Sequence, residues 1–190
     1  MRAAIPRVPV GLAHRPTIGG LIVPWVNLAL ADGGADFRGI HNTKWQRAWT
    51  EGLCQVCGLP LVRPVVLLGG PNQLAGYFDE APLHPWCAAY TAKACPMVAG
   101  RLARYADRPQ VSEGRRGQVC PEPGCNCGGW THTPGIPHGS GRGEPAHAWW
   151  AVWCENYALA ATPQGRLLGG VPAGELRRRL VSTPPTEPVP

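Results

Sequence analysis

The sequence predicts an α+β fold, in which a few helices and short antiparallel strands are organised around clusters of cysteine. Short runs rich in β-branched residues, such as residues 62–68, alternate with segments of helical periodicity, such as residues 42–53. The 190 residues include 25 Gly and 22 Pro, so turns are frequent and long elements are rare. The eight cysteines fall mainly into two groups with the spacing of metal ligands, so metal ions are expected to hold the loops in place.

Composition divides the chain into an arm, one domain and a tail. Residues 1–17 are rich in Pro and are predicted to form an extended N-terminal arm, residues 18–181 a single α+β domain, and residues 182–190 a disordered tail. No apolar run reaches the roughly 18 residues that a membrane-spanning helix needs, and the N-terminus lacks the continuous apolar stretch of a signal peptide. A cytoplasmic location is therefore expected, where cysteines serve more often as metal ligands than as disulfides.

The first part of the domain is predicted to contain a strand over residues 21–30, a returning strand over residues 37–40 and then a helix. Asn42 is a suitable N-cap for this helix, which is expected to run to about Leu53. Apolar residues recur at every fourth position of the helix and are expected to face the core: Trp45, Trp49 and Leu53.

Cys54 and Cys57 form a C-x-x-C motif, the first of two pairs of candidate metal ligands. A turn of this length directs both thiolates to one point, and Gly58 follows where such turns often need a positive φ. The second pair, His84 and Cys87, is predicted to lie on the first turn of a helix, where i, i+3 spacing places both side chains on one face. Three sulfur atoms and one imidazole form a closed Cys₃His set, which is typical of structural zinc. We therefore predict a first zinc ion at these four residues.

The predicted order of knuckle, strand, loop and helix over residues 54–95 resembles a treble-clef zinc finger. The helix is expected to begin at His84 and to run to about Ala94. A closed site has no open position for water, which argues against catalysis at this metal ion. Treble clefs also occur in HNH nucleases, so a nuclease is a remote alternative. The His41-Asn42 pair, however, precedes the knuckle and is in the wrong place for that chemistry.

A second and tighter group of cysteines lies in a glycine-rich loop over residues 120–143. It supplies three sulfur atoms within eight residues, from Cys120, Cys125 and Cys127. The fourth ligand is either His132, which is local, or Cys95, which would pin the loop to the end of the second helix. We predict a second zinc ion in this metal-stapled loop and leave the choice between the two ligands open. The alternative is a flexible loop with free thiols.

The C-terminal part of the domain is predicted to contain a helix followed by a hairpin, together residues 145–171. The helix, from Pro145 to about Tyr157, carries aromatic residues at every fourth position. A turn at residues 162–165 then joins the two strands of the hairpin. Residues 176–180 are predicted to form a final edge strand.

The chain is basic, with a net charge of +6 and sixteen Arg against two Lys. The Arg bias indicates a GC-rich genome first, and only second a surface selected for an acidic partner such as nucleic acid. Candidate contact residues for nucleic acid or a partner are five arginines and one tryptophan: Arg115, Arg116, Arg177, Arg178, Arg179 and Trp130. Because side chains alternate along a strand, Arg178 is expected to point away from its two neighbours.

Four segments of the chain resemble a family of uncharacterised proteins from actinobacteria and their phages. The segments are CQVCGLPL (54–61), LHPWCAAYTAKACP (83–96), CNCGGW (125–130) and WWAVWCENYALAATPQGRLLG (149–169), and the resemblance covers residues 20–181. It implies an intracellular zinc-binding protein encoded by a phage or prophage. No activity is established for that family, so the resemblance carries over no catalytic residue.

Three functions of different classes are consistent with these observations. The first is a non-enzymatic, zinc-stabilised binding module that contacts nucleic acid through its Arg-rich surface. The second is a protein–protein adaptor, such as a phage factor acting on host proteins through Trp130 and the glycine-rich loop. The remote third is the HNH-like nuclease. Salt dependence separates the first two, because counterion release makes nucleic-acid binding weaken steeply with salt.

Overall fold

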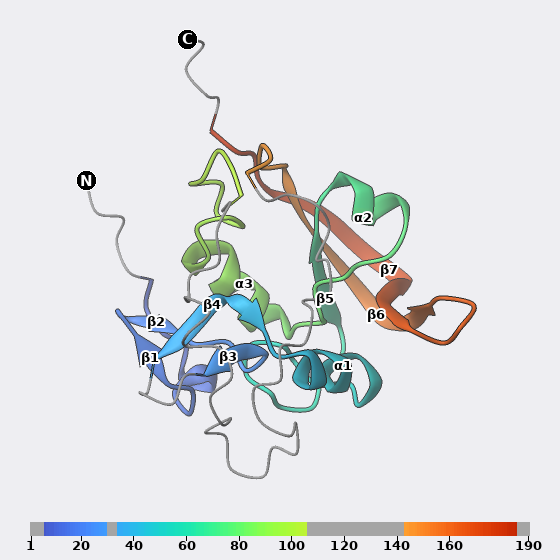
Figure 1. The fold of residues 1–190 in the computed structure, drawn as a ribbon, viewed down its shortest axis with the longest axis horizontal. Coiled ribbons are helices and arrows are strands. Elements are labelled where there is room, and N and C mark those ends of the chain that lie inside the picture. The colour runs from blue at the N-terminus through green and yellow to red at the C-terminus, as the bar shows by residue number, and fades with distance from the viewer. Residues whose placement is uncertain (1–5, 30–33, 106–142, 186–190) are drawn as a thin grey trace.

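The computed structural model describes residues 6–29, 34–105 and 143–185 of the chain. Within these ranges, short antiparallel sheets pack with three α-helices (Figure 1). The strands are β1 (Thr17–Ile18), β2 (Leu21–Ile22), β3 (Asn27–Ala29), β4 (Ala35–Ile40), β5 (Val65–Gly69), β6 (Trp149–Ala161) and β7 (Leu167–Ser182), and the α-helices are α1 (Asn42–Thr50), α2 (Pro71–Ala75) and α3 (Pro85–Ala94). The mixture of helices and antiparallel sheets confirms the predicted α+β class. None of the described helices is long and apolar enough to cross a membrane.

The N-terminal segment packs against the rest of the protein, so the extended arm predicted for residues 1–17 is wrong in its described part. A 3₁₀ helix spans Val10–Leu12, and the Leu12 side chain is fully buried. The His14 ring then hydrogen-bonds the Cys57 carbonyl oxygen (Nε2···O 3.0 Å). A single leucine between prolines has no periodicity, which is why the sequence did not indicate that this segment joins the core.

The first two hairpins lead the chain into α1. β1 pairs with β2 and β3 pairs with β4, both antiparallel, so the strand predicted over residues 21–30 is divided in two. α1 has His41 at its N-cap and ends at Thr50, close to the predicted bounds. Trp45 and Trp49 are each 1% exposed, as predicted for a stripe that faces the core. Leu53, the third residue of the predicted stripe, lies beyond the end of α1 and pairs with Pro60.

The central sheet has the strand order β5-β6-β7, with both pairs antiparallel. Residues 77–83, the loop in the predicted order of knuckle, strand, loop and helix, pair with both edges of this sheet. Leu83 pairs with Val66 of β5, and Phe78 pairs with Gly170 of β7. This segment therefore links the two edges of the sheet and delivers the chain to the start of α3.

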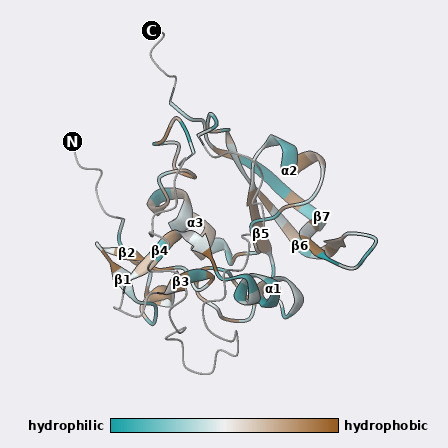
Figure 2. Cartoon of the chain, viewed as in Figure 1, coloured by the Kyte–Doolittle hydropathy of each residue, from teal (hydrophilic) through white to brown (hydrophobic). Residues whose placement is uncertain are grey.

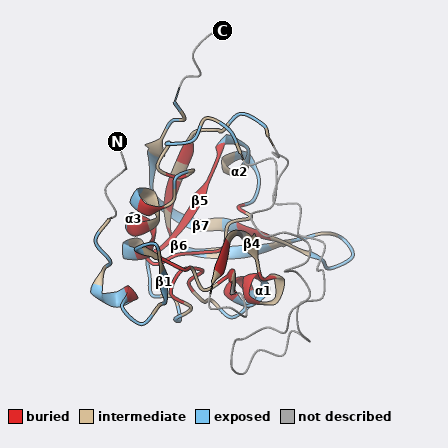
Figure 3. Cartoon of the chain, turned by 60° about the vertical axis from the view of Figure 1, so that its left-hand side comes forward, coloured by how far each residue is buried: buried red, intermediate tan, exposed pale blue. Residues whose placement is uncertain are grey.

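A hydrophobic cluster lies on each face of β5 and β6. Figure 2 shows β5 as hydrophobic along its length, and Figure 3 shows it as buried. Val66 and Leu68 pack on one face with residues that include Leu12, Cys54, Cys57, Leu83, Cys87, Ala88, Tyr90, Trp149 and Ala151, here called the α3 cluster. Val65 and Leu67 pack on the other face with Val26, Trp45, Ala48, Trp49, Phe78, Ala81, Val152 and Cys154, here called the α1 cluster.

The helix predicted from Pro145 to Tyr157 is wrong, because Trp149–Ala161 is the strand β6. A spacing of four residues is about one helical turn, but it is also two pleats of a strand, so it marks one face of either element. Pairing decides between them, since β6 hydrogen-bonds β5 on one side and β7 on the other. Trp149 and Ala151 enter the α3 cluster, whereas Val152 and Cys154 enter the α1 cluster.

The hairpin predicted after Tyr157 is confirmed. The Thr162 N–H donates to the Arg166 carbonyl oxygen (2.9 Å) across the turn. β7 then continues without a break, so the edge strand predicted at residues 176–180 is part of it. Ser182 ends this strand and donates its hydroxyl to the Val98 carbonyl oxygen (2.7 Å), so the predicted tail does not begin at residue 182.

Candidate metal centre

The structure brings together the four residues predicted to form the first metal site. One ligand atom from each of Cys54, Cys57, His84 and Cys87 lies within 4.8 Å of the others. The four residues are at most 3% exposed. No other group of three or more candidate ligands is found within the described ranges, so this is the one metal centre that they support.

The geometry of these atoms fits a tetrahedral metal ion. Bonds of about 2.0 to 2.3 Å place neighbouring ligand atoms of a tetrahedron roughly 3.3 to 3.8 Å apart. The Cys57 sulfur atom and Nδ1 of His84 are 3.3 Å apart. Thiolate and imidazole ligands select transition metals over magnesium or calcium. The four side chains could therefore hold one transition-metal ion with every coordination position filled by the protein.

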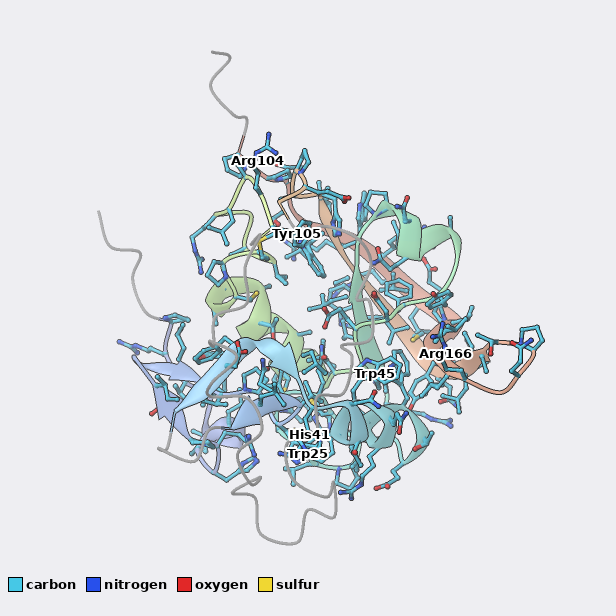
Figure 4. The ribbon with its side chains drawn as sticks, in the orientation of Figure 1. Trp25, His41, Trp45, Arg104, Tyr105 and Arg166 are labelled. Atoms are coloured by element: carbon cyan, nitrogen blue, oxygen red, sulfur yellow. The ribbon has the colours of Figure 1, made fainter. Side chains whose placement is uncertain are left out.

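The knuckle that carries Cys54 and Cys57 is held as a tight turn. The Gly58 N–H donates to the Cys54 carbonyl oxygen (2.8 Å), and Gly58 has the positive φ, 76°, that the sequence predicted. A Cβ atom at Gly58 would lie 2.7 Å from Cγ of Trp25, so this position excludes a side chain on steric grounds as well. Lys44 and Arg47 of α1 lie over the ring of Trp25, which is labelled in Figure 4, each 5.7 Å from the ring centroid, and these contacts connect the knuckle to that helix.

His84 and Cys87 are positioned by the start of α3. His84 is the N-cap and follows directly on the pairing of Leu83 with β5, while Cys87 is the third residue of the helix. The Nε2 atom of His84 hydrogen-bonds the Pro60 carbonyl oxygen (2.9 Å), which places the proton on Nε2 and leaves Nδ1 as the ligand atom. The helix N-terminus also favours negative charge on the Cys87 sulfur atom.

The three thiols are arranged so that one of them ionises readily and two do not. Hydrogen bonds from Cys54 and then Cys87 lower the pKa of Cys57. Burial raises the pKa of Cys54, and hydrogen bonds with the other two sulfur atoms raise the pKa of Cys87. A bound cation would let the other two thiols ionise, which is the electrostatic reason that this cluster suits a metal ion.

Two residues that the sequence reading did not single out complete the surroundings of the centre. Trp86 stacks on the His84 ring, with centroids 4.4 Å apart and planes 9° apart, while 44% of Trp86 remains exposed. His14 holds the Cys57 carbonyl oxygen from the N-terminal segment. Trp86 lies inside the H-x-x-C motif, so its position next to Cys87 could have indicated that it lies close to the metal centre. No sequence pattern marked His14.

The second predicted metal group falls largely on residues that the structure does not describe. Outside the described ranges lie Cys120, Cys125, Cys127, His132, Trp130, Arg115 and Arg116. Cys95, one candidate for the fourth ligand, is the C-cap of α3 and is partly buried. Burial raises its pKa, which favours the neutral thiol. The second zinc ion stays a prediction.

The three adjacent arginines lie on β7 and divide between its two faces. Arg177 is paired with Trp153 across the sheet and covers its ring, with the guanidinium carbon 4.0 Å from the centroid. Arg179 is paired with Ala151 and shares that face. Arg178 is paired with Val152 on the opposite face, where it forms an ion pair with Glu175 (2.7 Å). The predicted alternation is confirmed.

Comparison with models of protein families, with curated proteins and with solved structures finds no match to this chain. The resemblance to actinobacterial and phage proteins therefore stays a prediction.

Proposed function

We propose that this chain is a non-enzymatic binding module whose fold depends on structural zinc. The observation that carries the proposal is the buried and complete Cys₃His donor set. Its four ligand atoms converge within 4.8 Å, so no coordination position is left for water or substrate. Metal-assisted hydrolysis needs such an open position, which is why the site favours a structural role over catalysis.

Zinc is the metal that fits this proposal best. It has no redox chemistry, prefers tetrahedral sites, and commonly takes three thiolates with one imidazole in structural sites. The chain runs from the knuckle through β5, α2 and residues 77–83 to α3, and the two ligand pairs at the ends of this stretch support our proposal of a treble-clef-like site. The knuckle supplies one ligand pair, and the start of α3 supplies the other. An HNH-like nuclease is only a remote alternative. Its catalytic His would have to lie near α3, whereas His41 is the N-cap of α1.

Nucleic acid is the partner that the basic surface of β7 supports. Arg177 and Arg179 are exposed and share one face of the strand. Arg177 lies flat on Trp153, and this arrangement orders the guanidinium group before it meets a phosphate. Arg178 is on the other face with its charge offset by Glu175, so two arginines rather than three are expected to contact the phosphate backbone.

The test compares variants of the same strand in a binding titration. Fluorescence anisotropy with labelled duplex and single-stranded DNA, over a range of salt concentrations, should show binding that weakens steeply with salt. The double change Arg177→Ala and Arg179→Ala should reduce the salt slope for duplex DNA by about 1.8, because two phosphate contacts are lost. Arg178→Ala is the matched control and should leave the slope nearly unchanged. No binding by the native protein would reject nucleic acid as the partner, and equal effects of the two changes would reject Arg177 and Arg179 as its contacts.

A protein–protein adaptor is the second candidate function, and one observation favours it. β7 is a long strand at the edge of the central sheet, and residues 173–180 are all exposed. Exposed sheet edges are templates for a strand from another chain.

A further inference from the structure

Among the described residues, the outer edge of β7 has a main-chain partner only near the start of the strand. β7 spans Leu167–Ser182 and pairs along its inner edge with β6. On its outer edge, the described residues provide one partner, Phe78, which pairs with Gly170 near the start of the strand. From Val171 onward, no described strand or bridge covers this edge. Pro172 has no N–H, and the pairing with β6 shifts at Leu176, so the stretch that offers outward N–H and C=O groups to an added strand is the C-terminal part of β7, around Arg177 to Leu180.

The side chains give this edge two different faces. Arg177 and Arg179 lie on the face that carries Trp153, and both are exposed. The other face carries the Glu175–Arg178 ion pair, which is internally neutral, and Leu180, which is 41% exposed. One face of the edge is thus cationic, and the other is neutral and partly apolar.

A shallow hollow lies beside the same part of the strand. It has a volume of about 320 Å³ and is lined by Arg63, Pro64, Glu155 and Leu176. Leu176 is 57% exposed, so it offers apolar surface next to free main-chain groups. The other lining residues of the hollow belong to β6 and to the approach to β5, so the hollow extends inward from Leu176, and a strand added at the outer edge would meet the Leu176 side chain itself.

We propose that the outer edge of β7 binds an extended segment of a partner protein as an added strand, and that this segment alternates acidic with apolar residues. Its acidic side chains would lie across from Arg177 and Arg179, and its apolar side chains across from Leu180 and beside Leu176. Opposite charges on neighbouring strands stabilise their pairing, and alternation is the pattern that a strand with two unlike faces requires. This inference rests on the adaptor function, and because it uses Arg177 and Arg179, the acidic segment would compete with nucleic acid for these two residues.

A second copy of the chain fits this edge less well. Two β7 strands that pair antiparallel around the arginine run would place arginines directly opposite each other, and like charges opposite each other are destabilising. Each chain also carries a net charge of +6, which opposes self-association. Charge complementarity therefore selects an acidic partner.

The experiment uses synthetic peptides as probes for the full-length protein. The first peptide has ten residues that alternate Val and Glu, and the second alternates Val and Lys. Two further Val-Glu peptides carry backbone N-methyl groups on alternate residues. In one peptide the Val residues are methylated, and in the other the Glu residues are methylated. Affinity is measured by calorimetry, and the binding site by hydrogen exchange of the β7 amides.

Strand addition predicts a result that charge attraction alone does not. Successive N–H groups of a strand point in opposite directions, so one N-methylated peptide should bind like its parent and the other should lose binding. The Val-Glu peptide should slow exchange within residues 171–181, and the Val-Lys peptide should not. The double change Arg177→Glu and Arg179→Glu should weaken the Val-Glu peptide by roughly tenfold or more and improve the Val-Lys peptide, whereas Arg178→Glu should change affinity by a factor of about 2.

Three outcomes would overturn the proposal. Equal binding of both N-methylated peptides would show charge attraction without strand pairing. Absence of protection in β7 would place the peptide elsewhere. A dimer of the free protein with protected β7 amides would identify a second copy as the occupant. None of these outcomes affects the DNA titration described above, so failure of strand addition and failure of nucleic-acid binding can be told apart.

Discussion

His84 connects the metal centre to the fold through both ring nitrogen atoms and one ring face. Nδ1 points to the Cys57 sulfur atom (3.3 Å), Nε2 is held by the Pro60 carbonyl oxygen (2.9 Å), and Trp86 stacks on the ring. The ring orientation is therefore set by contacts with Pro60 and Trp86 as well as by the neighbouring Cys57. Such fixed ligands lower the entropic cost of coordination, and their supporting partners usually matter for metal affinity.

The first residue-scale prediction concerns Cys57→Ser. Structural zinc contributes roughly 10 kcal/mol or more in small zinc-binding domains, and whole domains are stable by only about 5 to 15 kcal/mol. The variant should therefore lose the zinc of this site and most of its folded population. Elemental mass spectrometry of the purified protein and thermal melting by circular dichroism measure both effects.

Cys95→Ser is the matched control for this change. Cys95 lies at the end of α3 and is not among the four converging ligands. The control should keep the spectrum of a cobalt-substituted Cys₃His site, because that spectrum reports the four converging ligands and not the second predicted zinc ion. A native melting curve for Cys57→Ser would disprove the structural site.

The second residue-scale prediction concerns the pH dependence of stability. Burial, followed by the neighbouring Asp79 charge, raises the pKa of Glu80 from 4.5 to about 7 in spite of a hydrogen bond with Gln55. Because the folded pKa lies above the unfolded value, the native state prefers protonated Glu80. The contribution to stability is thus complete below pH 4.5 and is lost as the pH rises through about 7.

Glu80→Gln tests this directly, since it keeps an amide in place of the neutral acid. Between about pH 5 and pH 8, the native protein should lose about 1 to 3 kcal/mol of unfolding free energy relative to the variant. Urea unfolding at several pH values, with zinc present throughout, measures the difference. If the unfolding free energies of the two proteins changed with pH in parallel, the pKa of Glu80 would be the same in the folded and unfolded states, and the prediction would be wrong.

At the residue scale, the sequence was sufficient to find the four residues that could hold a metal ion but not their surroundings. Two ligand pairs with short internal spacing can be recognised without knowing the fold, because each pair is local. His14 and Pro60 act through contacts with Cys57 and His84 that are distant in sequence. Such contacts depend on the tertiary structure, so no local pattern could indicate them.

At the element scale, the helix α3 was predictable and the strand β6 was not. α3 has Pro85 at its first position and cysteine ligands on one face, which are both local signals. The aromatic residues Trp149, Trp153 and Tyr157 are spaced by four, and this spacing suits either a helix or a strand. Only pairing with β5 and β7, which are far away in sequence, distinguishes the two elements.

The element-scale prediction tests the packing of α1 against the start of β7. A Cβ atom at Gly170 would collide with the Trp49 ring, and neither group can move freely in the α1 cluster. Gly170→Ala should therefore destabilise the protein by about 1 to 3 kcal/mol through overpacking. Chemical denaturation measures this loss.

Gly11→Ala is its matched control, because a Cβ atom there would meet Trp86 at 3.5 Å, an ordinary contact distance. The control should change stability by less than about 0.5 kcal/mol. If both changes had the same effect, the tight approach of Trp49 to β7 would be disproved.

At the scale of the whole molecule, β5 and β6 join the metal centre to the rest of the protein. Their alternate residues enter the α3 cluster, which holds the three cysteine ligands, and the α1 cluster, which holds Trp45 and Trp49. Neither cluster is complete without these two strands. The molecule is therefore expected to respond to metal loss as one unit, even though α1 supplies no ligand.

Removal of the metal ion with a chelator tests this coupling. Loss of zinc should open the α3 cluster, expose one face of β5 and β6, and so withdraw the support of the α1 cluster on the other face. Hydrogen exchange followed by mass spectrometry should then show α1 and α3 losing protection together, and addition of zinc, but not magnesium, should restore both helices. Faster exchange confined to the knuckle and α3, with α1 still protected, would mean that the zinc site is a local clip and that the two clusters fold independently.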